Sequence, residues 1–259
     1  MDSQVPSLQQ YCYDLLAEYS GYIQDLDGIY PSYILEIGLR SNPFGLINIE
    51  SIAETLDLSL AWEKIFNSNP EQFNTSLKSL VQGPDYHKQV VLCSSVNKLL
   101  NNQDLDDEDL QKFLSLCHGL KIVEITKINR LNTEIVLGSF LNLIHLNLAD
   151  SKIGPSAGVF IDRLLNSNQC LQTLNLRNCI LLDEGVQGFL QSLQHTKIIT
   201  FILCWNDLTF KLLSQLCEII LAHHFLSIID LSNNVRRQDV LQLRKLTNHI
   251  KSIRKISIT

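Results

Sequence analysis

Apolar residues recur along the second half of the chain in a fixed pattern. The clearest copy is Leu171-Gln-Thr-Leu174-Asn-Leu176-Arg-Asn-Cys179, in which three leucines are followed by a cysteine three positions later. Similar segments begin at residues 120, 143, 198, 226 and 253, so successive starts lie 23, 28, 27, 28 and 27 residues apart. A period of this length indicates stacked copies of one unit, each of which buries its apolar face only against its neighbour.

Between these segments the apolar spacing changes from two residues to three or four, which is typical of helices. Residues that favour helix starts stand at the right places: Pro155 suits a first turn, Asp183 and Thr209 suit caps, and Asp239 lies where the helix dipole favours a carboxylate. The sequence therefore predicts alternating strands and helices, with helices over residues 155–165, 183–193, 209–224 and 238–250.

The motif L-x-x-L-x-L-x-x-N/C with a period of 27 to 28 residues resembles the ribonuclease-inhibitor type of leucine-rich repeat. The resemblance implies an α/β fold: a short right-handed leucine-rich repeat solenoid with a parallel inner sheet and outer helices. We expect this domain to span residues 89–259, with a leading strand over residues 89–95 and a helix over residues 104–116. The Asn or Cys that closes each motif is expected to bond backbone groups at the turn.

Residues 1–88 are expected to form an N-terminal helical cap or docking region. A cap is needed because the first strand of a solenoid otherwise leaves apolar surface uncovered. Helical spacing predicts helices within residues 49–66 and over residues 71–81. An amphipathic helix is also predicted over residues 7–19, where Leu8, Cys12 and Leu16 share one face.

The N-terminal helix resembles the box by which substrate receptors bind elongin C, since Ser7-Leu8, Cys12 and Leu16 match that pattern. The segment Ile29-Tyr-Pro31-Ser-Tyr-Ile-Leu35 is similar to the proline-centred box that selects a cullin, although Gly38 stands where that box prefers an aliphatic residue. Receptors of the ZYG type place such boxes ahead of leucine-rich repeats. The resemblance implies a ubiquitin-ligase adaptor that docks elongin B/C and a cullin through Leu8, Cys12, Leu16 and Pro31. The alternative is that these residues only seal the solenoid.

Composition and charge narrow the remaining classes of protein. The chain has 45% hydrophobic residues but no apolar run of 18, and residues 1–16 hold two acids and no base, so we expect neither a membrane span nor a signal peptide. Seven cysteines without a C-x-x-C pair suggest buried thiols in a reducing compartment, cytoplasmic or nuclear. We expect a monomer.

The net charge of −6 hides a basic C-terminal end. Seven basic residues follow Val235, against Asp239 alone. Two interpretations remain open: the solvated face of a terminal helix, or a docking surface for an acidic partner. Nucleic acid is disfavoured because neither interleaved aromatics nor a known binding motif accompanies the charge.

The sequence predicts no catalytic residue, cofactor or metal site. It contains no nucleophile elbow, phosphate-binding glycine loop or zinc-spaced cluster, and its seven histidines have no periodic partner. We therefore expect a binding protein rather than an enzyme.

The predicted binding surface is the concave face of the sheet, to which the residues between the inward leucines point. Trp205 is the first candidate hot spot and Arg177 the second, because these residue types dominate interface energetics. Trp205 is expected on one rim with Asp150, Asn178 and Asn233; the alternative is that it is an ordinary, half-covered ridge residue. The candidate partner-binding residues are Glu124, His145, Asn147, Asn175, Arg177, Ile202, Trp205 and Asp230.

Overall fold

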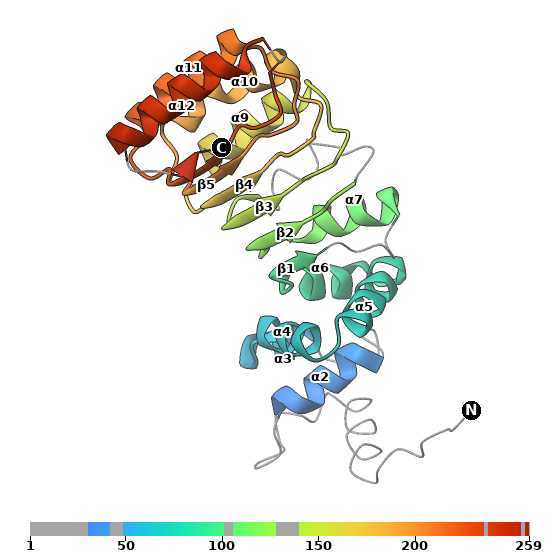
Figure 1. Ribbon diagram of the computed structural model, residues 1–259. Helices are drawn as coiled ribbons and strands as arrows, with labels where there is room; N and C mark the ends of the chain where they lie inside the picture. The colour runs from blue at the N-terminus through green and yellow to red at the C-terminus, as the bar shows by residue number, and fades with distance from the viewer. Residues whose placement is uncertain are drawn as a thin grey trace, which may run out of the picture. The chain divides into compact units, whose positions relative to one another are not determined.

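The computed structural model describes residues 31–41, 49–100, 106–127, 140–235, 238–254 and 257–258 (Figure 1). Its contacts divide the chain into two compact units. The first comprises residues 1–98 with 102–119, and the second comprises residues 99–101 with 120–259. The predicted helix over residues 7–19 lies outside the described residues.

The first unit is helical in its described part. Asp57, Asn69, Asp85 and Asp106 cap four of its helices by accepting hydrogen bonds from backbone N–H groups of the first turn. These caps explain where the helices start, since each Asp or Asn directly precedes a run of apolar residues at helical spacing. The helices are α2 (Pro31–Ser41), α3 (Ile49–Thr55), α4 (Leu58–Ser68), α5 (Pro70–Gln82), α6 (Tyr86–Ser94) and α7 (Asp107–Leu116).

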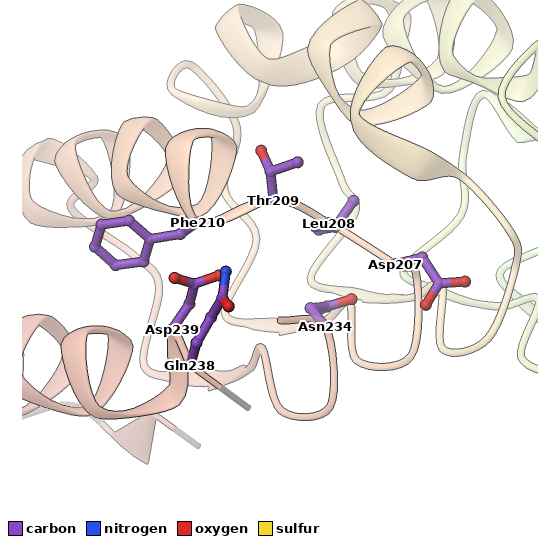
Figure 2. Close-up of a pocket in the computed structure, with 7 residues that line it drawn as sticks. All are labelled: Asp207, Leu208, Thr209, Phe210, Asn234, Gln238 and Asp239. Carbon is purple, nitrogen blue, oxygen red and sulfur yellow. The ribbon is translucent and has the colours of Figure 1, made fainter. Parts of the chain in front are cut away.

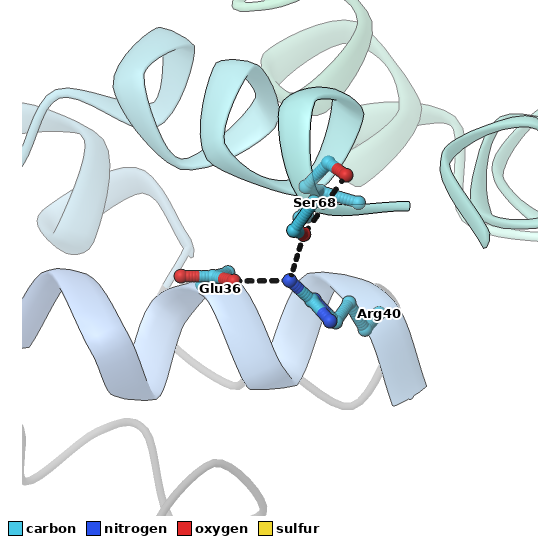
Figure 3. A network of polar contacts seen from close by, with 4 residues as sticks. Glu36, Arg40 and Ser68 are labelled. Atoms are coloured by element: carbon cyan, nitrogen blue, oxygen red, sulfur yellow. Dashed lines mark hydrogen bonds and ion pairs between the residues drawn. The ribbon is translucent and has the colours of Figure 1, made fainter. Parts of the chain in front are cut away.

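Helix α2 packs into this unit through both apolar and polar contacts. Leu35 and Leu39 are fully buried. The Arg40 guanidinium donates to the Glu36 carboxylate and to the Ser68 hydroxyl of α4, as Figure 3 shows. Gln72 of α5 donates to the Arg40 carbonyl over 3.0 Å. The segment that resembles the cullin-selecting box therefore includes the start of α2, at Pro31. The later residues of α2 belong to the core of the first unit.

The leading strand expected over residues 89–95 is wrong, because this segment belongs to helix α6. Asp85 caps the helix, and the buried Gln89 side chain donates to the carbonyls of Leu80, Val81 and Gly83 at the end of α5. These bonds give further partners to carbonyls at and just beyond the C-terminus of α5, where the helix itself supplies few donors. A short apolar run such as Val-Val-Leu-Cys does not distinguish strand from helix by itself.

The second unit is a leucine-rich-repeat-like α/β solenoid, as predicted. Its parallel sheet has the strand order β1 to β7, and Figure 1 shows α9 to α12 together on one side of that sheet. The central residue of each of the strands β2 to β6 is buried, which fixes the register between neighbours. The strands are β1 (Lys98–Leu100), β2 (Ile122–Glu124), β3 (His145–Asn147), β4 (Thr173–Asn175), β5 (Thr200–Ile202), β6 (Ile228–Asp230) and β7 (Ser257–Ile258).

Four helices in the described part of the repeats confirm the predicted segments to within a few residues. They are α9 (Ala157–Ser167), α10 (Leu182–Leu193), α11 (Phe210–Ala222) and α12 (Val240–Arg254). On α12, Leu243 and Ile250 are buried whereas Arg244, Lys245 and Lys251 are exposed. Among the described helices, none is long and apolar enough to cross a membrane.

Helices α9 and α10 approach each other through three glycines. A Cβ atom on Gly158 would lie 2.3 Å from the carbonyl oxygen of Gly185, and one on Gly188 would lie 3.2 Å from the backbone of Gly158. The two backbones are therefore in direct contact at this point. We call Gly158, Gly185 and Gly188 the glycine seam. Beside it, the Ser192 hydroxyl of α10 donates to the Asp162 carboxylate of α9.

Candidate interaction surface

The predicted floor residues lie on the face of the sheet opposite the buried strand centres. In each strand from β2 to β5 the residues before and after the buried centre are half-buried. In β6, Ile228 is 51% exposed. Parallel register places Glu124, Asn147, Asn175, Ile202 and Asp230 in one row across the face.

Several polar side chains of this row are already used by the fold. The Asn147 Oδ1 accepts from the backbone N–H of Ala149 over 3.0 Å, and Asn175 Oδ1 accepts from that of Arg177 over 3.0 Å. Asp230 repeats the arrangement with the Ser232 N–H. These are Asx turns, which reverse the chain direction at the end of a strand. These side-chain oxygens therefore stabilise the turns, and the row offers a partner fewer hydrogen-bond acceptors than the sequence indicates.

Glu124 of this row is in contact with His145, a floor residue of the neighbouring strand β3. The His145 Nε2 lies 3.3 Å from the Glu124 Oε1, in contact but without hydrogen-bond geometry. This part of the floor is therefore polar, but the two side chains already contact each other.

Arg177, Cys204 and Asp230 form a small electrostatic group at the ends of β4, β5 and β6, with Asp230 as the last residue of β6. Burial and, to a lesser extent, the hydrogen bond with Asp230 raise the pKa of the Cys204 thiol to about 11, whereas the positive charge of Arg177 acts in the opposite direction. Cys204 therefore remains an uncharged thiol at neutral pH. Arg177 itself is exposed and is the cation of this part of the surface.

The residues that close each motif form a ladder of hydrogen bonds inside the strand-to-helix turns. Each donates to a backbone carbonyl of the preceding repeat, which confirms the expected role of this position. The donors and acceptors are Ser151 to Ile125 (3.4 Å), Cys179 to Leu148 (3.1 Å), Asn206 to Leu176 (2.7 Å) and Asn234 to Leu203 (3.0 Å).

Asn206 is the best connected member of this ladder. Its Nδ2 donates to the carbonyls of Leu176, Leu203 and Cys204, and its Oδ1 accepts from the backbone N–H groups of Cys179 and Leu181. Its side chain is fully buried. One amide thus satisfies five backbone groups in two adjacent turns.

The residue before each ladder position adopts a left-handed backbone conformation. The φ values are 59° at Asp150, 50° at Asn178, 61° at Trp205 and 57° at Asn233. The N–H of Trp205 donates to the Ser232 carbonyl over 3.2 Å, and Asp150 and Asn178 form the equivalent bond. Asn and Asp tolerate this conformation, whereas a bulky side chain is strained in it. Trp205 is nevertheless found there, and its side chain is 52% exposed.

Two more exposed apolar residues in the neighbouring turn have the same strained conformation. Ile180 has φ 57° and corresponds to Asp207 one repeat later, while Leu182 has φ 56° and corresponds to Gly154 one repeat earlier. Leu182 donates through its backbone to the Asn206 carbonyl, so its turn is bonded directly to the turn of Trp205. We call Ile180, Leu182 and Trp205 the exit rim.

A pocket opens next to the exit rim, between the turns that lead into α11 and α12 (Figure 2). Its volume is about 440 Å³. Figure 2 shows the Phe210 ring and the Asp239 carboxylate at one end of the pocket and Asp207 at the other. The lining residues are Asp207, Leu208, Thr209, Phe210, Asn234, Gln238 and Asp239.

The predicted site residues are therefore only partly brought together. Trp205, Arg177 and Asp230 lie at or just after the ends of neighbouring strands, as expected, whereas Glu124 lies two to four strands away and His145 one to three. Sequence reasoning missed Ile180, Leu182 and the pocket. The signal for the first two was present, because aligning the repeats places Ile180 opposite Asp207 and Leu182 opposite Gly154. Leu8, Cys12 and Leu16 lie outside the described residues.

Within the part of the chain that the structure describes, no three His, Cys, Asp or Glu side chains gather closely enough to hold a metal ion. No protein-family model matches the chain. A protein phosphatase 1 regulatory subunit 37 homolog of Caenorhabditis briggsae is 28% identical to it over 123 residues. That match covers 42% of this chain and 13% of the relative, so the chain spans only a small part of the relative's length.

Proposed function

We propose that the repeat unit is a non-enzymatic protein-binding module that engages its partner on the open side of the sheet and at the exit rim. The observation that carries this proposal is Trp205, which is exposed in a left-handed conformation where three other repeats have Asn or Asp and the repeat of β2 has Lys127. Strained residues of this kind persist where they serve a function, because a better-tolerated residue type would stabilise the fold. Tryptophan is also the side chain most enriched among binding hot spots.

The relative's name suggests what the binding is for. That protein is described as a regulatory subunit of protein phosphatase 1. We propose by analogy that this chain regulates a partner by binding it, and the purified catalytic subunit of protein phosphatase 1 is the first partner to test.

Site-specific photocrosslinking tests the surface. A benzophenone side chain placed at Thr200 on the open face is expected to crosslink the partner, whereas one at the exposed Glu218 of α11 is not. Trp205→Asn and Arg177→Ala should each weaken partner binding by about tenfold or more, with Val159→Ala on α9 as the exposed apolar control. Equal crosslinking from both faces would contradict the proposal.

The second candidate function is that of an elongin–cullin adaptor. The observation in its favour is the sequence of the N-terminal box, with Leu8, Cys12 and Leu16, ahead of the repeats. Purified elongin B/C should bind the wild-type chain and not the Leu8→Ala/Cys12→Ala variant, with circular dichroism as the check on folding. Failure of the folded wild type to bind elongin B/C would rule out this function.

A further inference from the structure

The exit rim and the adjoining pocket together define the chemistry of the segment that binds there. The rim offers three exposed apolar side chains, each at a backbone position that favours another residue type. The pocket begins two residues after Trp205, at Asp207, so the apolar and the acidic parts form one continuous surface. An occupant of both must therefore carry an apolar and a polar group.

The electrostatic sign of the pocket follows from four contributions. The N-termini of α11 and α12 border the pocket, and each contributes about half a positive charge. Asp207 and Asp239 contribute two whole negative charges, and none of the lining residues is basic. The sum is negative by about one charge. The concave shape concentrates this potential.

The hydrogen-bonding groups that remain available in the pocket are also mainly acceptors. Thr209 donates through its hydroxyl to Asp183 and accepts from the Leu212 N–H, and Asn234 is committed to the turn ladder. Within the described residues, neither Asp207 nor Asp239 has an ion-pair partner. The Phe210 ring adds an aromatic face at the Asp239 end (Figure 2). Carboxylates beside an aromatic face are the surroundings that a Lys or Arg side chain prefers.

We propose that the exit rim binds an extended segment of a partner protein that places a bulky apolar side chain against Trp205 and a Lys or Arg side chain in the adjoining pocket. This inference rests on the proposed function, since it names the chemistry of the partner at the same surface. The pocket, at about 440 Å³, is large enough for one such side chain and its water.

Nuclear magnetic resonance of the whole chain tests this directly, because it contains only two tryptophans. Trp205 reports on the rim. Trp62 serves as an internal reference, since it is 1% exposed and its Nε1 donates to Ser95. The probes are acetylated Leu-(Gly)n-Arg amides with roughly one to four glycines, since each extended residue adds about 3.5 Å. The matched control peptides carry citrulline, which is neutral and has the shape of Arg.

We expect the Trp205 indole signal to shift saturably with the Arg peptides while the Trp62 signal stays fixed. The citrulline peptides should bind about tenfold more weakly, which corresponds to one lost charge-assisted hydrogen bond. Asp207→Asn/Asp239→Asn should remove that preference. The first substitution keeps the fold, because Asn tolerates the left-handed conformation of residue 207 at least as well as Asp.

Three outcomes would overturn the inference: equal binding of Arg and citrulline peptides, a preference that survives Asp207→Asn/Asp239→Asn, or no Trp205 shift up to about 10 mM peptide. Binding that appears only in Arg236→Ala/Arg237→Ala would also overturn it, because this chain's own arginines would then be the occupant. Crosslinking to a partner at Thr200 without an Arg preference would leave the proposed function standing and remove only this inference.

Discussion

The repeats of β3–β4 and those of β5–β6 have the same strand–turn–helix structure, but different contacts hold each pair together. The first pair is held mainly by its helices and the second mainly by its turns. In the first pair the turn positions are Ser151 and Cys179, which make weak hydrogen bonds, while the helices meet at the glycine seam. In the second pair the turn positions are Asn206 and Asn234, and α11 and α12 contain no glycine. A repeat can thus gain its nearest-neighbour stability on either side of the sheet.

The largest expected effect comes from Asn206→Ala, which removes the best connected member of the ladder, the residue that joins the repeat of β5 to that of β4. Three backbone groups in two adjacent turns lose their hydrogen bond: the Leu176 carbonyl and the N–H groups of Cys179 and Leu181. The carbonyls of Leu203 and Cys204 keep the hydrogen bonds that they accept from Asn234 and Asn178. Each unsatisfied buried group costs about 1 to 3 kcal/mol before relaxation. We expect a loss of about 3 kcal/mol or more in urea denaturation followed by circular dichroism. Asn248→Ala, at an exposed position of α12, should change stability by less than about 0.5 kcal/mol. Similar losses for the two variants would contradict the comparison.

Gly158→Ala is expected to have the next largest effect and acts on the first pair. At an uncrowded helical position this substitution stabilises by up to about 1 kcal/mol. Here the new Cβ would lie 2.3 Å from the Gly185 carbonyl oxygen, so α9 and α10 must separate. We expect a net loss of about 2 kcal/mol, within the range for overpacked cores. Arg163→Ala on the exposed side of α9 is the control, and a stabilised Gly158→Ala would show that the helices are not in contact.

Trp205→Asn tests the stability of the turn after β5, where the second pair adjoins the first. Asn is the residue at the equivalent positions 178 and 233, and the left-handed conformation costs a bulky residue about 1 kcal/mol. We therefore expect the variant to be more stable by about 1 kcal/mol, measured as a higher melting temperature. Val159→Asn on α9 removes a similarly exposed apolar side chain without this gain. A destabilised Trp205→Asn variant would show that the indole supports the fold rather than binding.

The smallest expected effect concerns the buried thiols of both pairs. Burial raises the pKa of Cys179 and of Cys217 to about 12 and that of Cys204 to about 11. At pH 8 these thiols are uncharged, so iodoacetamide should alkylate the exposed Cys170 well before them, as mass spectrometry can follow. Since the unfolded chain loses these protons near pH 9, stability should fall as pH rises from about 9 to 12. Rapid alkylation of Cys179 in the folded chain would contradict its burial.

The sequence predicted the repeated part of the fold well because the same local pattern occurs in several copies, and each copy supports the assignment of the others. Leu174 and its equivalents mark each strand centre, and a one-residue error would have placed the leucines on the wrong face. Residues 89–95 offered no such repetition. Gln89, which fastens α6 to the end of α5, bonds to carbonyls of a turn whose geometry the sequence does not encode locally.

The candidate site was predictable in position but not in energetics. The motif is enough to place Trp205 on the rim, just after a strand. The sequence does not show that Asn147, Asn175 and Asp230 each use a side-chain oxygen in their own turn. The reason is that an Asx turn and a binding contact require the same residue types. The pocket depends on two turns 30 residues apart and has no local signature.

The glycine seam also sets how sharply the sheet bends. Neighbouring strands lie about 4.8 Å apart, whereas packed helices usually lie 8–10 Å apart, and this mismatch makes a stack of strand–helix units curve toward the strand side. Where Gly158 and Gly185 bring α9 and α10 into backbone contact, we expect a smaller mismatch and a locally flatter arc. The sector of β3–β4 should therefore curve less than that of β5–β6, and we expect a rigid partner to fit the two sectors differently.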